Sequence, residues 1–377
     1  MARKDKIKYW DIWNVLSVKA RYYVIYGERS NGKTYGTLEF CLEEYFKNGS
    51  EFAYIRRWDE DLVGKKGESL FNAHIKNNVI QKLSHGKYNH VIYRSRAYYL
   101  AHINEEGEVD LCDARPFAYA FAISQQEHYK SNSYPNIKYI IFDEFLTRGA
   151  YLPDEFILFQ NLLSTIIRLR DDVTIFMLGN TVNKYCPYFK EMGLNRIKTQ
   201  KEGTIDVYEY GETGLKVAVE YACIDTKIKK SNVYFAFNNP RLNMIKNGSW
   251  EIDIYPHYPR DIYKGVDDKD IKYTFYIVFE GDILEGNIIY KSLDRDDKPR
   301  PSYFLFIHPK TTPIKDDNRN LVYMQDSSAL PNYRRKITKP TSLLEKKIVS
   351  FFAKDKVFYS DNETGEIMRN YIEWCKA

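Results

Sequence analysis

Cysteine is scarce in this chain of 377 residues, and its five cysteines lie far apart without a Cys-x-x-Cys pair. Their spacing argues against a disulfide framework and against a zinc site, and it fits a reducing compartment. The seven histidines are scattered, and no pair has the His-Glu-x-x-His spacing of a metalloprotease. No apolar run approaches the ~18 residues of a membrane span, and no apolar signal segment follows the charged N-terminus. We therefore expect a soluble cytoplasmic protein without a membrane partner.

The strongest motif in the sequence is a P-loop. An apolar run, Tyr22–Tyr26, breaks into a segment that matches G-x-x-x-x-G-K-[ST]. Lys33 is expected to reach the β- and γ-phosphates of ATP, and the Thr34 hydroxyl is expected to bind Mg²⁺. A helix-compatible segment, Thr34–Tyr45, follows, and its first N–H groups would face the anion. The predicted nucleotide-binding set is Gly27, Glu28, Arg29, Ser30, Asn31, Gly32, Lys33, Thr34 and Tyr35.

A second motif supplies the acids that a P-loop needs. The apolar run Lys138–Phe142 ends in Asp143 and Glu144. Asp143 would hold Mg²⁺, directly or through water, and Glu144 would polarise the water that attacks the γ-phosphate. Placed about a hundred residues after a P-loop with another strand between them, this pair is typical of the Walker B strand of a P-loop ATPase.

A polar tip ends the next predicted strand. The continuous apolar run Val173–Leu178 is typical of a parallel strand buried on both faces, and Gly179-Asn180 follows it. Asn180 either senses the γ-phosphate and positions the water, or simply forms a turn. The order of the elements favours the sensor.

Several basic residues are candidates for stabilising charge in the transition state. P-loop motors in rings commonly borrow an arginine from a neighbouring subunit. Arg168 and Arg170 end the predicted helix Asp154–Leu169, and we select Arg170, with Lys130 as a second candidate on the same face. Arg29, inside the P-loop, would contact the γ-phosphate of its own subunit. Surface salt bridges are the alternative for each.

Two basic clusters are candidates for contact with DNA. Lys65 and Lys66 lie between Gly64 and Gly67, which predicts a flexible basic loop. Lys227, Lys229 and Lys230 form the second cluster, although a charge run is usually a solvated face. The aromatic residues Tyr9, Trp10 and Trp13 either stack on an adenine base or pack on the sheet.

The pattern of the chain changes after residue 197. We expect an ATPase domain over 1–197, a linker or small bridging region over 198–245 and a second domain over 246–377. The second domain reads β-β-β-α-β-α, which is compatible with an RNase H-like sheet. Its candidate metal ligands are Glu280, Asp282 and Asp361, but no acid lies in the middle of its first strand. We therefore expect a domain without nuclease activity.

Together, the P-loop with its internal arginine, the run IIFDEF, the segment RLRDD and the strand ending in Gly-Asn resemble a known group. They are similar to the genome-packaging ATPases of small short-tailed phages, relatives of the large terminase subunits. The resemblance implies an additional-strand P-loop ATPase with an inactive RNase H-like domain. It further implies a homomeric ring, expected to be a pentamer, that drives double-stranded DNA into a procapsid.

The resemblance also implies where the protein acts and with what. The ring would sit in the host cytoplasm at the portal vertex of the procapsid, and it would be absent from the mature virion. The positions matching Arg170 and Lys130 would act on a neighbouring subunit. Some relatives use a packaging RNA, and the sequence leaves open whether this chain does. The alternatives are a large terminase with an active nuclease, another nucleic-acid motor such as a helicase, and a nucleotide-gated assembly protein without turnover.

Overall fold

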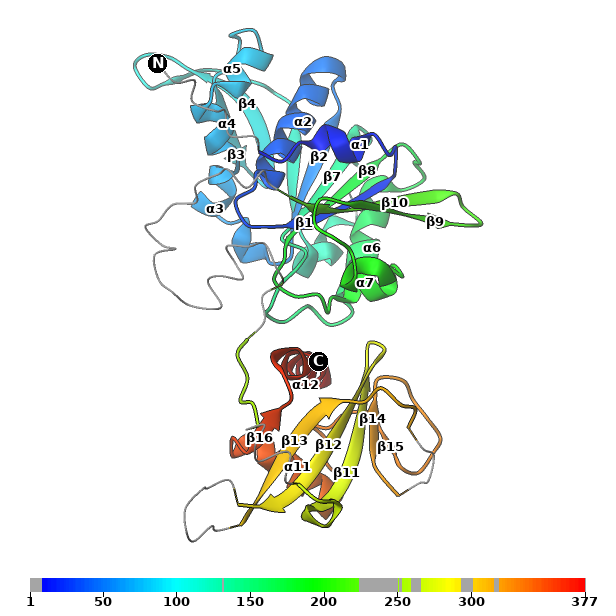
Figure 1. Cartoon of the computed structure of the whole chain (residues 1–377). Helices are drawn as coiled ribbons and strands as arrows, with labels where there is room; N and C mark the ends of the chain where they lie inside the picture. The colour runs from blue at the N-terminus through cyan, green and yellow to red at the C-terminus, as the bar shows by residue number, and fades with distance from the viewer. Residues whose placement is uncertain are drawn as a thin grey trace, which may run out of the picture. The chain divides into compact units, whose positions relative to one another are not determined.

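The computed structural model describes residues 9–130, 132–223, 250, 253–258, 266–292, 301–314 and 319–376. The chain divides into two compact units, Met1–Glu251 and Ile252–Ala377, and each contains a sheet of its own (Figure 1). Lys227, Lys229 and Lys230 lie outside the described residues, so their contact with DNA stays a prediction.

The first unit is built on a 10-stranded sheet in the order β3-β4-β6-β2-β7-β8-β1-β10-β9, with β5 paired to β4. The strands from β6 to β10 in this order are mutually parallel. They are Ala118–Ala122 (β6), Glu51–Arg56 (β2), Ile137–Asp143 (β7), Thr174–Asn180 (β8), Tyr22–Gly27 (β1) and Leu215–Ala222 (β10). Strand β8 lies between β1 and β7 and is the additional strand that the predicted P-loop fold requires, so this prediction is confirmed.

Helices cover both faces of this sheet (Figure 1). Helices α1 (Ile12–Leu16) and α2 (Lys33–Asn48) contribute to the core on one face. Helices α6 (Glu155–Ile167) and α7 (Pro187–Glu191) contribute to the core on the other face. The apolar runs of the central strands are therefore buried from both sides, as parallel strands require.

Antiparallel strands extend the sheet at both ends. They are β3 (His90–Arg94), β4 (Ala97–Ile103) and β5 (Val109–Cys112) at one end, and β9 (Ile205–Tyr210) at the other. The sequence analysis placed residues 198–245 in a linker or bridging region, whereas β9 and β10 belong to the main sheet. The alternating pattern of these short strands does not predict that β10 pairs with β1, a strand almost two hundred residues earlier in the chain. The other predicted domain limits stay predictions.

The segment between β2 and β3 is helical. It contains η1 (Asp59–Asp61), α3 (Lys65–Glu68), η2 (Ser69–Phe71), α4 (Asn72–Lys76) and α5 (Val79–Leu83). The expectation of a flexible basic loop at Gly64–Gly67 is wrong, because Lys65 and Lys66 begin α3. Both lysines are exposed, and their contact with DNA stays a prediction.

The second unit contains a six-stranded sheet in the order β15-β14-β11-β12-β13-β16. Three antiparallel strands form its centre, and β14 and β16 add in parallel at either side. Its strands are Ile271–Phe279 (β11), Asp282–Lys291 (β12), Ser302–Pro309 (β13), Val322–Met324 (β14), Tyr333–Arg334 (β15) and Val357–Tyr359 (β16). The antiparallel centre, with β14 and β15 beside β11, agrees with the predicted RNase H-like sheet, and β16 adds a strand at the other edge.

Among the described residues of the second unit, the helices are α11 (Leu343–Ala353), α12 (Asn362–Lys376) and the short η5 (Asp268–Asp270). The Ser342 hydroxyl accepts from the Glu345 N–H and caps α11. In the first unit, η3 (Ile123–Tyr129), which is kinked at Gln125, and the single turn η4 (Asn195–Lys198) lie between larger elements. No helix among the described segments has both the length and the hydropathy of a membrane span.

Candidate active site

The P-loop (Gly27–Thr34) follows β1 and leads into α2. Two of its glycines are required by geometry. Gly32 has a φ of 94°, which residues with a side chain rarely adopt, and a Cβ on Gly27 would lie 2.4 Å from the carbonyl oxygen of Ala222. Because α2 begins at Lys33, the N–H groups of its first turn have no partner within the helix. The loop therefore has the shape and the donors that suit an oxyanion.

Lys33 lies inside the loop that precedes it. Its Nζ donates to the Glu28 carbonyl oxygen at 2.8 Å, to Asn31 Oδ1 at 3.0 Å and to Asn180 Oδ1 at 3.4 Å. Burial lowers the pKa of Lys33 to about 8, while the carboxylate of Asp143 opposes this shift most strongly. The P-loop lysine and the polar tip of β8 thus meet, as the sequence analysis expects of Asn180.

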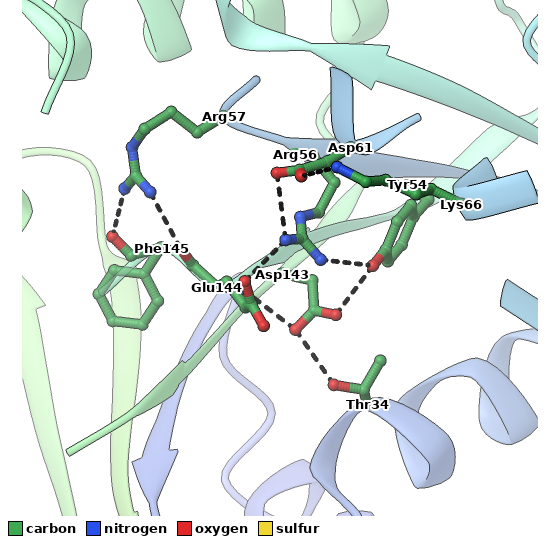
Figure 2. A network of polar contacts seen from close by, with 9 residues as sticks. All are labelled: Thr34, Tyr54, Arg56, Arg57, Asp61, Lys66, Asp143, Glu144 and Phe145. Carbon is green, nitrogen blue, oxygen red and sulfur yellow. Dashed lines mark hydrogen bonds and ion pairs between the residues drawn. The ribbon is translucent and has the colours of Figure 1, made fainter. Parts of the chain in front are cut away.

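The P-loop also meets the acidic end of β7. Thr34 Oγ1 donates to Asp143 Oδ1 at 3.1 Å, and the Tyr54 hydroxyl donates to Asp143 Oδ2 at 2.9 Å (Figure 2). Burial raises the pKa of Asp143, while the nearby Arg56 guanidinium and the hydrogen bond from Tyr54 oppose that rise. A hydroxyl and a carboxylate side by side are the oxygen ligands that Mg²⁺ prefers.

Glu144 follows Asp143 but its side chain takes another direction. Its backbone has a φ of 57°, a conformation that is uncommon for a residue with a side chain. Its Oε2 accepts from Arg56 Nη2 at 2.7 Å, and the same Nη2 lies 3.3 Å from Asp61 Oδ2 (Figure 2). The predicted catalytic carboxylate is therefore paired with an arginine from the end of β2.

The next residue, Arg57, holds the backbone that follows Asp143. Its guanidinium donates to the carbonyl oxygens of Glu144 at 3.3 Å and Phe145 at 2.7 Å, as Figure 2 shows. Its Nε donates to Glu155 Oε2 at 2.7 Å, and Glu155 Oε1 accepts from the Tyr188 hydroxyl at 2.8 Å. Arg57 and Glu155 are both buried. Arg56 at the end of β2 and Arg57 directly after it thus hold the side chain and the backbone of one acidic turn.

The P-loop, the acidic end of β7 and the polar tip of β8 line a cleft of about 240 Å³. It is lined by Ser30, Asn31, Gly32, Lys33, Thr34, Tyr35, Asp143, Glu144, Leu178, Gly179 and Asn180. The Nδ2 of Asn31 is buried there without a hydrogen-bond partner, which suits an anionic acceptor. The residues present therefore fit a polyphosphate, and the Thr34–Asp143 oxygen pair fits a divalent cation.

Three further candidates for contact with the nucleotide are Arg29, Tyr35 and Trp10. Arg29 is exposed and does not line the cleft, so its contact with the γ-phosphate stays a prediction. Tyr35 stacks on the ring of His74, with ring centroids 4.2 Å apart. Trp10 is buried, and its indole donates to Glu220 Oε2 at 3.0 Å, which agrees with packing rather than with stacking on a base.

Arg170 was selected as the arginine given to a neighbouring subunit, and the structure does not support that choice. Its guanidinium donates to five carbonyl oxygens of its own subunit, those of Tyr134, Pro135, Ile137, Ile166 and Ile167. A guanidinium has five N–H donors, so Arg170 ties the end of α6 to the segment before β7. The RLRDD pattern could not reveal this, because the carbonyl oxygens come from two distant segments.

Arg168 and Lys130 have more accessible side chains than Arg170. Arg168 is exposed and donates to the carbonyl oxygen of Asn132 at 2.7 Å. The Lys130 side chain is 54% exposed and pairs with Glu127. Both residues line a surface hollow of about 800 Å³ beside the end of α6, where Leu169 is fully exposed. They are therefore available to another molecule.

The candidate metal ligands of the second unit do not come together. Asp361 accepts from the Thr364 N–H at 2.7 Å at the start of α12, and Glu280 accepts from Gln325 Nε2 at 2.9 Å. Over the part of the chain that the structure describes, no group of three or more His, Cys, Asp or Glu residues is arranged to hold a metal.

The model of the family named Podovirus DNA encapsidation protein (Gp16) matches residues 4–210, which include all of the site described above. The chain belongs to this family. Among its relatives, the DNA packaging protein of Bacillus phage phi29 is 26% identical over 270 residues, which cover 62% of this chain and 75% of the relative.

Two solved structures have the same fold over nearly the whole chain. The bacteriophage Phi-29 viral genome packaging motor assembly aligns with a TM-score of 0.54 and 20% identity, and the alignment covers 96% of each chain. The Phi-28 gp11 DNA packaging motor aligns with a TM-score of 0.51 and 18% identity over 98% of each chain. These alignments support the two-sheet architecture.

Four residues of the site were not found from the sequence: Tyr54, Arg56, Arg57 and Glu155. The segment EFAYIRR was recognised only as a strand. Two arginines at the end of an otherwise apolar strand are the signal that could have identified it, because buried charge needs a partner. Glu155 gave no comparable signal, since an acid in the first turn of a helix is ordinary.

Proposed function

We propose that this protein is an ATP-hydrolysing motor that moves double-stranded viral DNA into a procapsid. The 3.1 Å hydrogen bond between Thr34 and Asp143 carries the proposal, because it joins the P-loop and the acidic strand end at one cleft. Because the chain belongs to the DNA encapsidation family, DNA packaging is the process that ATP hydrolysis would drive. The names of the phi29 relative and of the Phi-29 motor assembly support the same process.

In this proposal each residue of the cleft has a role. Lys33 and the first N–H groups of α2 bind the phosphates, and Thr34 and Asp143 hold Mg²⁺. Bound Mg²⁺ would neutralise charge on the β- and γ-phosphates. Glu144 orients and polarises the attacking water, and Asn180 contacts the γ-phosphate. Before it acts, Glu144 exchanges the hydrogen bond that its Oε2 accepts from Arg56 for one from the attacking water.

We further propose that the subunits form a ring and complete one another's sites. Arg168 replaces Arg170 as the residue given to the neighbour, with Lys130 beside it. Arg168 is exposed and accessible, whereas the five donors of Arg170 bond to its own subunit. A five-membered ring and a portal partner are carried over from the resemblance to packaging ATPases, which leaves open whether a packaging RNA is used. The second unit acts without nuclease chemistry.

ATPase activity with and without double-stranded DNA tests the proposal. We expect wild-type turnover to rise with DNA, and Lys33→Ala to abolish it. Arg168→Ala subunits mixed with wild type should reduce activity below the value for simple dilution. Arg94→Ala is a matched control, because Arg94 is an exposed arginine of the edge strand β3. A wild-type protein that binds ATP without DNA-dependent turnover would instead indicate a nucleotide-gated assembly protein.

A further inference from the structure

The buried strand β2 places a tyrosine hydroxyl against the acid that is expected to hold Mg²⁺. Tyr54 aligns with Ile141 of the neighbouring strand β7, and Asp143 lies two residues further along β7. Because residues two apart on a strand project from the same face, Tyr54 and Asp143 share a face of the sheet. The Tyr54 hydroxyl donates to Asp143 Oδ2 at 2.9 Å, as Figure 2 shows. Two adjacent parallel strands thus bring this donor and this carboxylate together.

The two carboxylate oxygens of Asp143 have different partners. Its Oδ1 accepts from Thr34 Oγ1 and from the Glu144 N–H, each at 3.1 Å. Its Oδ2 accepts from the Tyr54 hydroxyl. Tyr54 therefore engages one oxygen of the carboxylate and leaves the other beside the Thr34 hydroxyl, the second expected metal ligand. The carboxylate cannot turn without breaking its hydrogen bond to Tyr54.

Packing alone does not account for the Tyr54 hydroxyl. The Tyr54 side chain belongs to the same core cluster as Phe52, two positions earlier on β2, so a phenylalanine ring would suit this environment. Tyr54 is 4% exposed and Asp143 is 7% exposed, so little water is available to replace a lost hydrogen bond. Arg56 Nη1 lies 3.5 Å from the Tyr54 oxygen as a donor to it, which leaves the O–H of Tyr54 for Asp143.

We propose that Tyr54 is a positioning residue for the metal of this site: its hydroxyl fixes the Asp143 carboxylate so that Oδ1 stays available to the cation beside Thr34. Mg²⁺ tolerates little departure from octahedral geometry, so a ligand that is held in place favours its binding. Tyr54 does not line the cleft, and it acts through Asp143. This inference rests on the proposed function, because it concerns the metal of the same nucleotide site.

Nucleotide binding with and without metal tests this role. The full chain is titrated with the fluorescent, non-hydrolysable analogue mant-AMP-PNP in excess Mg²⁺ and in EDTA. The ratio of the Kd in EDTA to the Kd in Mg²⁺ measures what the metal contributes. In Tyr54→Phe the Kd in EDTA should stay close to that of wild type, because the phosphate donors are unchanged. The ratio should fall about tenfold or more, as is typical when the partner of a metal ligand is removed.

Tyr139→Phe is the matched control. The Tyr139 hydroxyl on β7 donates to Glu44 Oε2 at 3.0 Å, and Glu44 does not line the cleft. This variant removes the same kind of hydrogen bond and should keep the wild-type ratio. Weaker binding of Tyr54→Phe by the same factor with and without metal would show that Tyr54 only supports the shape of the cleft, and would overturn the inference.

A double-mutant cycle with Asp143→Asn tests whether Tyr54 acts through that carboxylate. If it does, Asp143→Asn alone and Asp143→Asn with Tyr54→Phe should have the same ratio, whereas additive losses would contradict the inference. Urea unfolding of each variant checks that the fold is kept. Normal binding by wild type with an unchanged ratio in Tyr54→Phe would overturn this inference alone. Failure of wild type to bind the analogue in Mg²⁺ would overturn the proposed function and the inference together.

Discussion

Arg56 Nη2 lies 2.7 Å from Glu144 Oε2, so a guanidinium pairs with the predicted catalytic carboxylate at the cleft. Arg56 also approaches Asp61 Oδ2 at 3.3 Å and the Tyr54 hydroxyl at 3.5 Å, so it joins β2, η1 and the acidic end of β7. The Glu144 side chain is 57% exposed and the Arg56 side chain 19% exposed, so water reaches this pair from the Glu144 side. We infer that the pair holds Glu144 in a resting position.

The first prediction concerns Arg56→Gln. Without its guanidinium partner, Glu144 is free to accept from a water in the cleft that it lines, so we expect ATPase activity without DNA to rise relative to activity with DNA. The ratio of the two rates measures this. Asp61→Asn is the control, because it removes the other carboxylate near Arg56 and leaves Glu144 paired. An equal fall of both rates in Arg56→Gln would show that Arg56 orients Glu144 for catalysis instead.

The second prediction concerns Glu144→Gln. The amide keeps an oxygen that accepts from Arg56 but cannot polarise water as a base, so turnover should fall by about 10²–10⁴-fold. Affinity for Mg-ATP should stay close to that of wild type, because Thr34, Asp143 and Lys33 are unchanged. Stopped-flow binding of a fluorescent ATP analogue and steady-state hydrolysis measure the two quantities. Hydrolysis at the wild-type rate would refute the role given to Glu144.

Local patterns predicted the parts of the site that lie within single segments. The P-loop was identified from eight consecutive residues, and the acidic strand end from seven, since each motif carries its own glycine or carboxylate spacing. The central strands were found because parallel strands buried on both faces are continuously apolar. Because the strands alternate with helices in βαβ order, the P-loop and the acidic strand end are expected at the same edge of the sheet.

Pairings between distant segments could not be predicted in the same way. The partner of Glu144 is a residue 88 positions earlier, and Arg170 bonds to carbonyl oxygens more than thirty positions away. Strand β10 joins the sheet beside β1 although its sequence resembles that of a free hairpin. In each case the stabilising free energy comes from contacts between distant segments. The local periodicity of the sequence does not reveal such contacts.

The third prediction concerns Glu155→Ala. Arg57 would then keep a buried positive charge without its carboxylate, and we expect a loss of about 3–5 kcal/mol in the free energy of unfolding. Glu209→Ala is the control, because the Glu209–Lys216 pair at 2.9 Å has side chains 61% and 46% exposed. Such a pair contributes about 0–1 kcal/mol. Urea unfolding measures both, and similar losses in the two variants would contradict a role for burial.

The fourth prediction concerns pH and Glu220 on β10. Burial raises the pKa of Glu220 from 4.5 to about 7; the Trp10 indole and Lys33 oppose this rise, and Asp11 adds to it. A carboxyl group with a raised pKa favours the folded state fully below its unfolded pKa, and that contribution is lost as pH rises through the folded pKa. Wild type should therefore lose stability between about pH 4.5 and pH 7 through this residue.

Glu220→Gln keeps an oxygen for the Trp10 indole and cannot ionise, so it should not show this loss. At about 1.4 kcal/mol per pKa unit, the variant should gain about 3 kcal/mol over wild type between pH 4.5 and pH 8. Urea unfolding across this range measures the difference, and groups that titrate alike in both proteins cancel. Glu209→Gln, with its side chain 61% exposed, should run parallel to wild type. Parallel curves for Glu220→Gln as well would mean that Glu220 ionises in the fold without penalty.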